Sequence, residues 1–316
     1  VNQGHCHPDI ISALNKQAHK LTLTSRAFHN NILGEFEKYA SDLFGYDKLL
    51  PMNTGAEGVE TAIKLCRKWA YEKKNINPES ANIIVFDGNF HGRTTTIISF
   101  SNDSDARNNF GPYTPGFISV PYNDIESLIS AVNNNDNIAG ILIEPIQGEA
   151  GVVVPDEGFL RNVKDLCSTH NILFIADEIQ TGIARTGKLL ACDYESVKPD
   201  ILILGKALSG GVFPVSAVLA DNDIMLCIKP GEHGSTYGGN PLACQVAIAA
   251  LDVIEKEDLC NNAYELGCLF RDELNQFIES NDLVSKVRGK GLLNAIVIND
   301  SPDSSTAWDI CLKLKE

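Results

Sequence analysis

The sequence contains no long hydrophobic run, no closely paired cysteines and few basic residues. No apolar stretch reaches the roughly 18 residues that a membrane-spanning helix needs, and the first residues do not resemble a signal peptide. We therefore expect neither a membrane protein nor a membrane partner. Lys and Arg number 26 against 41 Asp and Glu, a formal net charge of −15, which argues against nucleic acid as a partner.

The nine cysteines are odd in number, scattered and never spaced as CxxC. This usage indicates reduced thiols, several of them buried, rather than a disulfide framework. In His5-Cys6-His7 adjacent side chains diverge, and no second cluster has zinc spacing, so we predict no metal site. Because the chain starts at Val1, we expect an internal piece of a longer protein. We expect that protein to be cytoplasmic, with the mitochondrial matrix as the alternative.

Short apolar runs alternate with helical patterns from about residue 48 to residue 205. This alternation is typical of an α/β fold with a mostly parallel sheet flanked by helices. From about residue 258 the pattern changes to a long amphipathic helix followed by a turn and a strand. We predict a large domain over residues 1–257 and the start of a smaller α+β domain, incomplete here, over residues 258–316.

One lysine stands where a buried strand ends. Ile201 to Gly205 are apolar without alternation, which predicts a strand covered on both faces, and Lys206 follows before a glycine-containing turn. Open α/β sheets bind ligands beyond the carboxyl ends of their strands, so we expect Lys206 to be partly desolvated and to face a cleft. A neutral lysine amine condenses with aldehydes, of which pyridoxal phosphate is the usual example. The alternative is a surface lysine that merely follows a strand.

Carboxylates follow two other predicted strands. Asp177 and Glu178 end one apolar run, with Gln180 shortly after, and Glu149 lies in a glycine-flanked loop after a strand that ends at Glu144. A buried carboxylate at a strand end needs a cationic partner, because burying the isolated charge is costly. A protonated pyridine nitrogen would serve Asp177 in this way. A helix cap or a structural ion pair is the alternative.

Two glycine-containing turns are suited to phosphate. Thr54 and Gly55 precede a predicted helix whose first N–H groups are free, which makes an anion site. Ser235 and Thr236 lie in a glycine-rich loop before another helix and are candidate phosphate ligands. A plain helix N-cap and a flexible surface loop are the alternatives.

The loop GNFHGRT, residues 88–94, follows a further predicted strand. Phe90 could stack on a planar ring, and Arg93 could hold a substrate carboxylate with two hydrogen bonds. A core side chain for Phe90 and a solvated surface charge for Arg93 are the alternatives.

Six motifs in this order resemble the class III, pyridoxal phosphate-dependent aminotransferases. They are NTGAEGVETAIKLCRKW, GNFHGRT, EPIQGEAGVVVP, ADEIQTGIARTG, LGKALSGG and GEHGSTYGGNP, and they span nearly the whole chain. The resemblance implies the fold type I architecture of this class of transferases. It also implies a homodimer with its active sites at the subunit interface.

The resemblance assigns cofactor roles to residues that stand in these motifs. Lys206 is similar to the lysine that binds pyridoxal 5′-phosphate covalently and then carries the proton. Asp177 resembles the carboxylate that keeps the pyridine nitrogen protonated, Gln180 the partner of the phenolic oxygen, and Phe90 the residue that stacks on the ring.

The phosphate would meet a second group of residues. By resemblance, Gly55 and Ala56 bind it through their backbone N–H groups, with Thr54 beside them. Thr236 would reach the phosphate in the neighbouring subunit, which makes dimerisation a condition of activity.

On the substrate side, Arg93 resembles the anchor of the α-carboxylate. Glu149 resembles a switch residue that meets the donor's α-amino group in one half-reaction. In the other half-reaction it would pair with an arginine that the family carries in a region beyond Glu316, so that 2-oxoglutarate can bind. The motifs QGEAGVVVP and KPGEHGSTYGGNPLA are most similar to the branch that moves the δ-amino group of L-ornithine to 2-oxoglutarate, a step of arginine and proline metabolism. N-acetylornithine or 4-aminobutyrate as donor is the alternative. A non-enzymatic dimeric scaffold, which would be colourless, is a further one.

Overall fold

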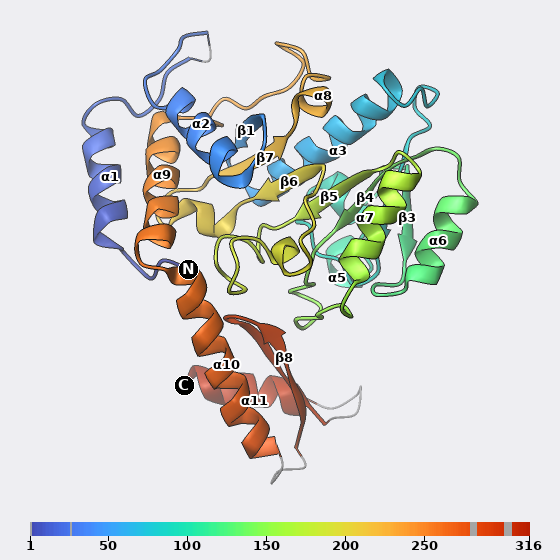
Figure 1. The fold of residues 1–316 in the computed structure, drawn as a ribbon, viewed down its shortest axis with the longest axis vertical. Helices are drawn as coiled ribbons and strands as arrows, with labels where there is room; N and C mark the ends of the chain where they lie inside the picture. The colour runs from blue at the N-terminus through green and yellow to red at the C-terminus, as the bar shows by residue number, and fades with distance from the viewer. Residues whose placement is uncertain (1, 26, 279–282, 300–304) are drawn as a thin grey trace.

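A seven-stranded sheet forms the centre of the computed structural model, which describes residues 2–25, 27–278, 283–299 and 305–316 (Figure 1). The strand order is β1-β7-β6-β5-β4-β2-β3. Strands β2 to β6 are parallel to one another, whereas β7 is antiparallel to both β6 and β1. The predicted mostly parallel sheet is therefore confirmed. The strands are β1 (Lys48–Met52), β2 (Asn82–Phe86), β3 (Phe117–Val120), β4 (Ile138–Ile143), β5 (Leu173–Asp177), β6 (Ile201–Leu204) and β7 (Ser216–Ala220).

Helices cover both faces of this sheet because alternate residues of its strands point to opposite sides. One face packs on α3, and the other packs on α2 and α9 at one end and on α6 and α7 at the other. Helix α1 lies outside α9 and begins at a proline, as predicted. The helices are α1 (Pro8–Ala18), α2 (Leu33–Phe44), α3 (Gly55–Glu72), α4 (Thr95–Ile98), α5 (Ser104–Arg107), α6 (Ile125–Asn133), α7 (Phe159–Thr169), α8 (Asn222–Met225) and α9 (Pro241–Lys256).

The C-terminal elements form a separate group below the sheet in Figure 1. Helix α10 (Leu259–Ile278) leads to a two-stranded antiparallel sheet of β8 (Val284–Lys290) and β9 (Leu293–Ile298), and α11 (Thr306–Lys315) follows. The expected turn, at Gly291, and the strand after it, β9, are confirmed. The prediction missed β8, because the charged residues before the turn belong to a second strand.

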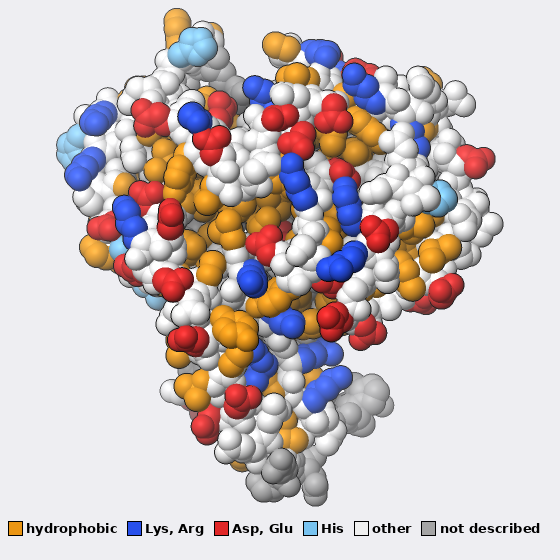
Figure 2. Space-filling model, in the orientation of Figure 1, with side chains coloured by type: hydrophobic (Ala, Val, Ile, Leu, Met, Phe, Trp, Pro, Cys, Tyr) orange, Lys and Arg blue, Asp and Glu red, His pale blue; other side chains and the backbone are white. Residues whose placement is uncertain are grey.

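The predicted apolar stripe of α10 is only partly covered. Ala263 is buried, whereas Leu266, Phe270 and Phe277 are 45%, 43% and 51% exposed. Figure 2 shows hydrophobic side chains at the surface of this lower part of the molecule. None of the described helices is long and apolar enough to cross a membrane.

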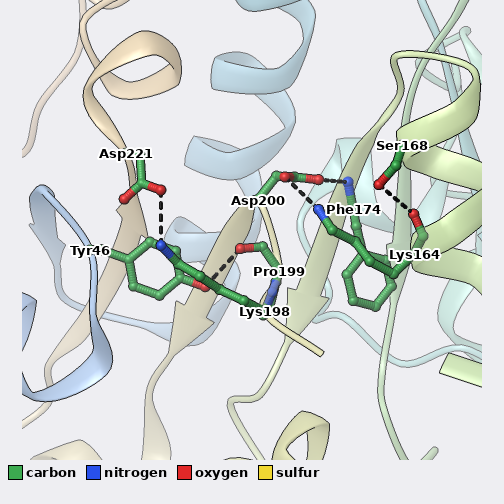
Figure 3. A network of polar contacts seen from close by, with 8 residues as sticks. All are labelled: Tyr46, Lys164, Ser168, Phe174, Lys198, Pro199, Asp200 and Asp221. Carbon is green, nitrogen blue, oxygen red and sulfur yellow. Dashed lines mark hydrogen bonds and ion pairs between the residues drawn. The ribbon is translucent and has the colours of Figure 1, made fainter. Parts of the chain in front are cut away.

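A polar network ties β5 to β6 at their amino ends (Figure 3). Asp200 pairs with Lys164 Nζ at 2.6 Å through one oxygen and accepts from the Phe174 N–H at 2.8 Å through the other. Nearby, the Tyr46 hydroxyl donates to the Pro199 carbonyl at 2.8 Å. The polar groups at this edge of the sheet thus bond to one another. The candidate site residues lie at the opposite edge, where the carboxyl ends of the same strands are.

The buried cysteines belong to the packed interior, and His7 caps a helix. Five cysteines are buried as free thiols, as predicted: Cys66, Cys167, Cys192, Cys227 and Cys244. His7 Nδ1 accepts from the Asp9 N–H and so caps α1, while its Nε2 lies 2.8 Å from a Glu257 carboxylate oxygen. Within the described ranges no three His, Cys, Asp or Glu side chains are placed to hold a metal ion.

Candidate active site

The carboxyl ends of β2, β4, β5 and β6 and the start of α3 surround one cavity of about 160 Å³. Parallel strands bring these ends to one edge, which is where open α/β sheets bind ligands. Six residues that the sequence singled out line this cavity: Gly55, Ala56, Phe90, Asp177, Gln180 and Lys206. They are drawn from positions up to 151 residues apart, taking Gly55 and Lys206 as the extremes (206 − 55).

Lys206 stands at the mouth of this cavity. It begins the short 3-10 helix η2 (Lys206–Ser209) directly after Gly205. Its backbone φ is +40°, in the left-handed region that a residue with a Cβ seldom adopts, which is a form of strain typical of functional sites. The expected desolvation is wrong for the single chain, because the Lys206 side chain is exposed. It lies between the cavity and a neighbouring open pocket lined by Thr54 and Phe213.

Asp177, the last residue of β5, is buried and held by two donors. Its Oδ2 lies 2.7 Å from His91 Nδ1, and its Oδ1 accepts from the Ile179 N–H at 3.1 Å. Burial alone would lower the pKa of His91, but the hydrogen bond and charge of Asp177 and the charge of Glu144 raise it overall. The His91 ring therefore favours the charged form beside the carboxylate. Its Nε2 is buried without a hydrogen-bond partner among the described residues.

Glu144 forms a second buried carboxyl group on the cavity wall. Its oxygens accept from the Phe90 N–H at 2.9 Å and from the Gly148 N–H at 3.4 Å. Burial raises the pKa of Glu144 to about 7, although the nearby His91 charge lowers it. Glu144 can therefore gain or lose a proton near neutral pH, within the same cluster as Asp177.

We did not assign roles to His91 and Glu144 from the sequence. His91 lies in the loop that holds Phe90, and Glu144 directly follows β4, so position after a strand was the available signal. What sequence reasoning could not supply was the contact between His91 and Asp177, which are 86 residues apart.

Thr54 caps α3. Its hydroxyl oxygen accepts from the Glu57 N–H at 3.2 Å, and the Glu57 carboxylate in turn accepts from the Thr54 N–H at 3.1 Å. This reciprocal pair is a capping box, so the Thr54 hydroxyl acts as the helix N-cap that we gave as the alternative to a phosphate ligand. It leaves the N–H groups of Gly55 and Ala56, the first two of the helix, directed toward the cavity end of α3.

Gln180 and Glu149 meet beside the cavity. Gln180 Nε2 donates to Glu149 Oε1 at 3.3 Å. The Glu149 loop fits closely here, since a Cβ added to Gly148 would lie 1.4 Å from Gln180 Oε1. A carboxylate is thus brought to the edge of the space that Lys206 faces.

Three other candidates lie outside the cavity lining. The Arg93 guanidinium carbon is 6.0 Å from the centre of the Phe90 ring. Ser235 Oγ accepts a hydrogen bond at 2.7 Å from Nδ2 of Asn53, the residue that precedes Thr54. Thr236 lines a different cavity, of about 240 Å³, together with residues of the segment 23–37.

The comparisons with known proteins agree with this geometry. The chain matches the family "Aminotransferase class-III" over residues 1–316. A protein of Drosophila melanogaster named "Ornithine aminotransferase, mitochondrial" is 59% identical over 316 residues, which are 100% of this chain and 72% of that protein. The corresponding rat protein is 58% identical and is covered to 71%.

Two solved structures extend the comparison to three dimensions. A crystal structure of the ornithine aminotransferase from Toxoplasma gondii superposes with a TM-score of 0.96 at 50% identity, over 99% of this chain and 74% of that one. A structure titled acetylornithine aminotransferase, from Elizabethkingia anophelis, has a TM-score of 0.91 at 65% identity, over 100% and 77%. A matched family over the whole chain, with these neighbours, places the chain among the class III aminotransferases, which are enzymes that depend on pyridoxal phosphate.

Proposed function

We propose that this aminotransferase takes its amino group from the δ-carbon of L-ornithine and gives it to 2-oxoglutarate. The products would be glutamate 5-semialdehyde and L-glutamate. The observation that carries this choice of donor is the Glu149 carboxylate at the cavity edge, 3.3 Å from Gln180, which suits the second, α-amino group of ornithine. Relatives named ornithine aminotransferase, 54% to 59% identical over the whole chain, support it.

The residues of the cavity fit pyridoxal phosphate. Gly55 packs closely on Ile179, since a Cβ there would lie 3.0 Å from the end of the Ile179 side chain, and the N-terminus of α3 offers N–H groups for a phosphate. When bound, the cofactor supplies an electron sink for charge that develops on the substrate carbon.

The residues in and around the lining would then hold the cofactor as follows. Lys206 would hold it covalently and, once released, would carry a proton to and from the substrate carbon. Asp177 would keep the pyridine nitrogen protonated, with His91 Nδ1 2.7 Å from its Oδ2. Gln180 would serve the phenolic oxygen and Phe90 the ring. Thr54, Ser235 and, from the partner subunit, Thr236 would serve the phosphate.

Two residues outside the cavity lining, Arg93 and Glu149, would bind the charged groups of the substrate. Arg93 binds the α-carboxylate through its guanidinium, and Glu149 pairs with the α-ammonium of the donor. A negative charge here attracts L-ornithine and disfavours a neutral acetamide, so it separates donors by charge.

N-acetylornithine is the second candidate donor. The 65% identity to a structure titled acetylornithine aminotransferase favours it, and it exceeds the identities to the relatives named for ornithine. The two donors share the reacting δ-amino group and differ only at the α-nitrogen, where Glu149 lies.

The assembly and its compartment are part of the same proposal. We infer a homodimer, with a large unit over residues 1–257 and a smaller one from residue 258; the separate β8–β9 sheet supports this boundary. The word mitochondrial in the names of the fly and rat relatives supports the matrix rather than the cytoplasm.

The donor is tested with the full-length protein loaded with cofactor. With 2-oxoglutarate as acceptor, we expect kcat/KM for L-ornithine to exceed that for N-acetyl-L-ornithine and 4-aminobutyrate by at least about tenfold, the scale of one charged contact. L-ornithine should also bleach the visible band of the bound cofactor, and 2-oxoglutarate should restore it. The reverse order of donors would overturn the proposed substrate while leaving the family assignment intact.

A further inference from the structure

The turn that carries Glu149 has an unusual backbone. The N–H groups of Gly151 and Val152 both donate to the Gly148 carbonyl at 3.0 Å, and Gln147 pairs with Val153 across the base. Within it Val152 is buried and has a φ of +55°. A β-branched residue in the left-handed region is a genuine outlier and persists only where its surroundings hold it.

One side chain from a distant element holds this turn. Arg288, in β8, donates from Nε to the Gly151 carbonyl at 2.9 Å. That carbonyl belongs to the planar peptide unit between Gly151 and Val152, so its direction is coupled to the φ of Val152. The contact therefore opposes the peptide rotation that would relax Val152.

Glu149 is part of this turn, between Gly148 and Gly151. Glu149 is one residue after Gly148, where the missing Cβ leaves room for Gln180. The contact of Glu149 Oε1 with Gln180 Nε2 depends on this fit. A rotated Gly151–Val152 peptide would change where the Glu149 carboxylate lies relative to the cavity.

We propose that Arg288 is a positioning residue for donor specificity, which holds the Glu149 turn so that its carboxylate meets donors with a free α-ammonium group. The inference rests on the proposed function, because it takes Glu149 as the group that reads the α-nitrogen. Arg288 is not among the described residues that line the cavity. The β8–β9 hairpin thereby acts on the site through one backbone carbonyl.

The chain offers a matched control in Arg271. Its Nη1 donates to the Gly291 carbonyl at 3.1 Å and to Asn294 Oδ1 at 2.8 Å, both on the same hairpin. Arg271→Gln thus removes an arginine that braces the hairpin and leaves the Glu149 turn alone. Arg288→Lys retains a donor and should restore most of the function.

The experiment compares Arg288→Gln, Arg288→Lys and Arg271→Gln in the full-length, cofactor-loaded protein. For Arg288→Gln we expect the ratio of kcat/KM for L-ornithine over N-acetyl-L-ornithine to fall about tenfold, mainly through KM for L-ornithine. Hydrogen exchange at the Gly151 and Val152 amides should become faster. Arg271→Gln should change neither quantity, and Arg288→Lys should lie near the wild-type protein.

Two outcomes would overturn the inference: unchanged exchange at these amides in Arg288→Gln, or equal losses of kcat/KM for both donors. Failure of the proposed function has a different signature. If the wild-type protein prefers N-acetyl-L-ornithine, the donor is wrong, yet the amide exchange still decides whether Arg288 holds the turn.

Discussion

At the scale of single residues, burial raises the pKa of the carboxyl groups of Glu144 and Glu178 even though hydrogen-bond donors oppose it. Glu178 accepts from the Thr181 hydroxyl and from the N–H groups of Ala191 and Cys192, and burial still raises its pKa. Glu144 accepts from two backbone N–H groups, and its pKa of about 7 puts its charge change in the physiological range.

Glu144 should make stability fall as pH rises. The pKa is raised from 4.5 in the unfolded chain to about 7 in the fold, so the folded state binds the extra proton between these values. The stabilisation is complete below pH 4.5 and is lost as pH rises through 7, by at most about 3 kcal/mol. Glu144→Gln removes this titration. The melting temperature of the variant minus that of the wild-type protein should therefore increase from pH 5 to pH 8; a difference that stays constant would contradict the raised pKa.

The residues that sequence reasoning found are those that follow strands. Lys206 and Asp177 stand at the ends of unbroken apolar runs, so the pattern that predicts the strand also predicts their position. The sequence around His91 does not predict its contact with Asp177, because that contact depends on the folded positions of two strands. The exposure of Lys206 was missed because position after a strand says nothing about solvent.

At the scale of elements, the two ends of a strand serve different purposes. Asp177 closes β5 at the cavity, while Asp200 precedes β6 at the opposite edge and joins Lys164 of α7 to the backbone of β5 (Figure 3). Apolar runs predicted β5 and β6. They could not predict β8, because Lys286, Arg288 and Lys290 interrupt its sequence with charged residues, as in a surface loop.

Asp200→Asn should lower the free energy of unfolding without changing kcat/KM. It removes the ion pair with half-buried Lys164 and disturbs the acceptor of the Phe174 N–H, a loss of about 1–3 kcal/mol in the free energy of unfolding. Thermal unfolding and kcat/KM should be measured together. The matched control is Asp42→Asn, which breaks the pair of Lys38 and Asp42, 77% and 66% exposed, and should cost under about 0.5 kcal/mol. Equal melting temperatures for the two variants would refute a structural role for the Asp200 network.

At the scale of the whole molecule, the proposed phosphate ligands lie in different places. Gly55 and Ala56 line the cavity with Lys206, whereas Thr236 lines the cavity of about 240 Å³ beside the segment 23–37. One chain therefore does not bring Thr236 into the lining of its own Lys206 cavity. The proposed two-fold dimer would resolve this, since each copy would contribute the same surface to its partner.

Mixed dimers test this arrangement. In a dimer of one Lys206→Ala and one Thr236→Ala chain, one site carries both changes and the other carries neither, provided that Thr236 acts across the interface. Random assembly of equal amounts makes about half of the dimers mixed, so about a quarter of all sites should be intact. Co-expressed chains should then show more activity at limiting pyridoxal phosphate than the two variants purified separately and combined without subunit exchange. If Thr236 instead served its own subunit, every mixed site would carry one of the two changes. Co-expression would then add nothing, and the dimer would have to be explained by stability alone.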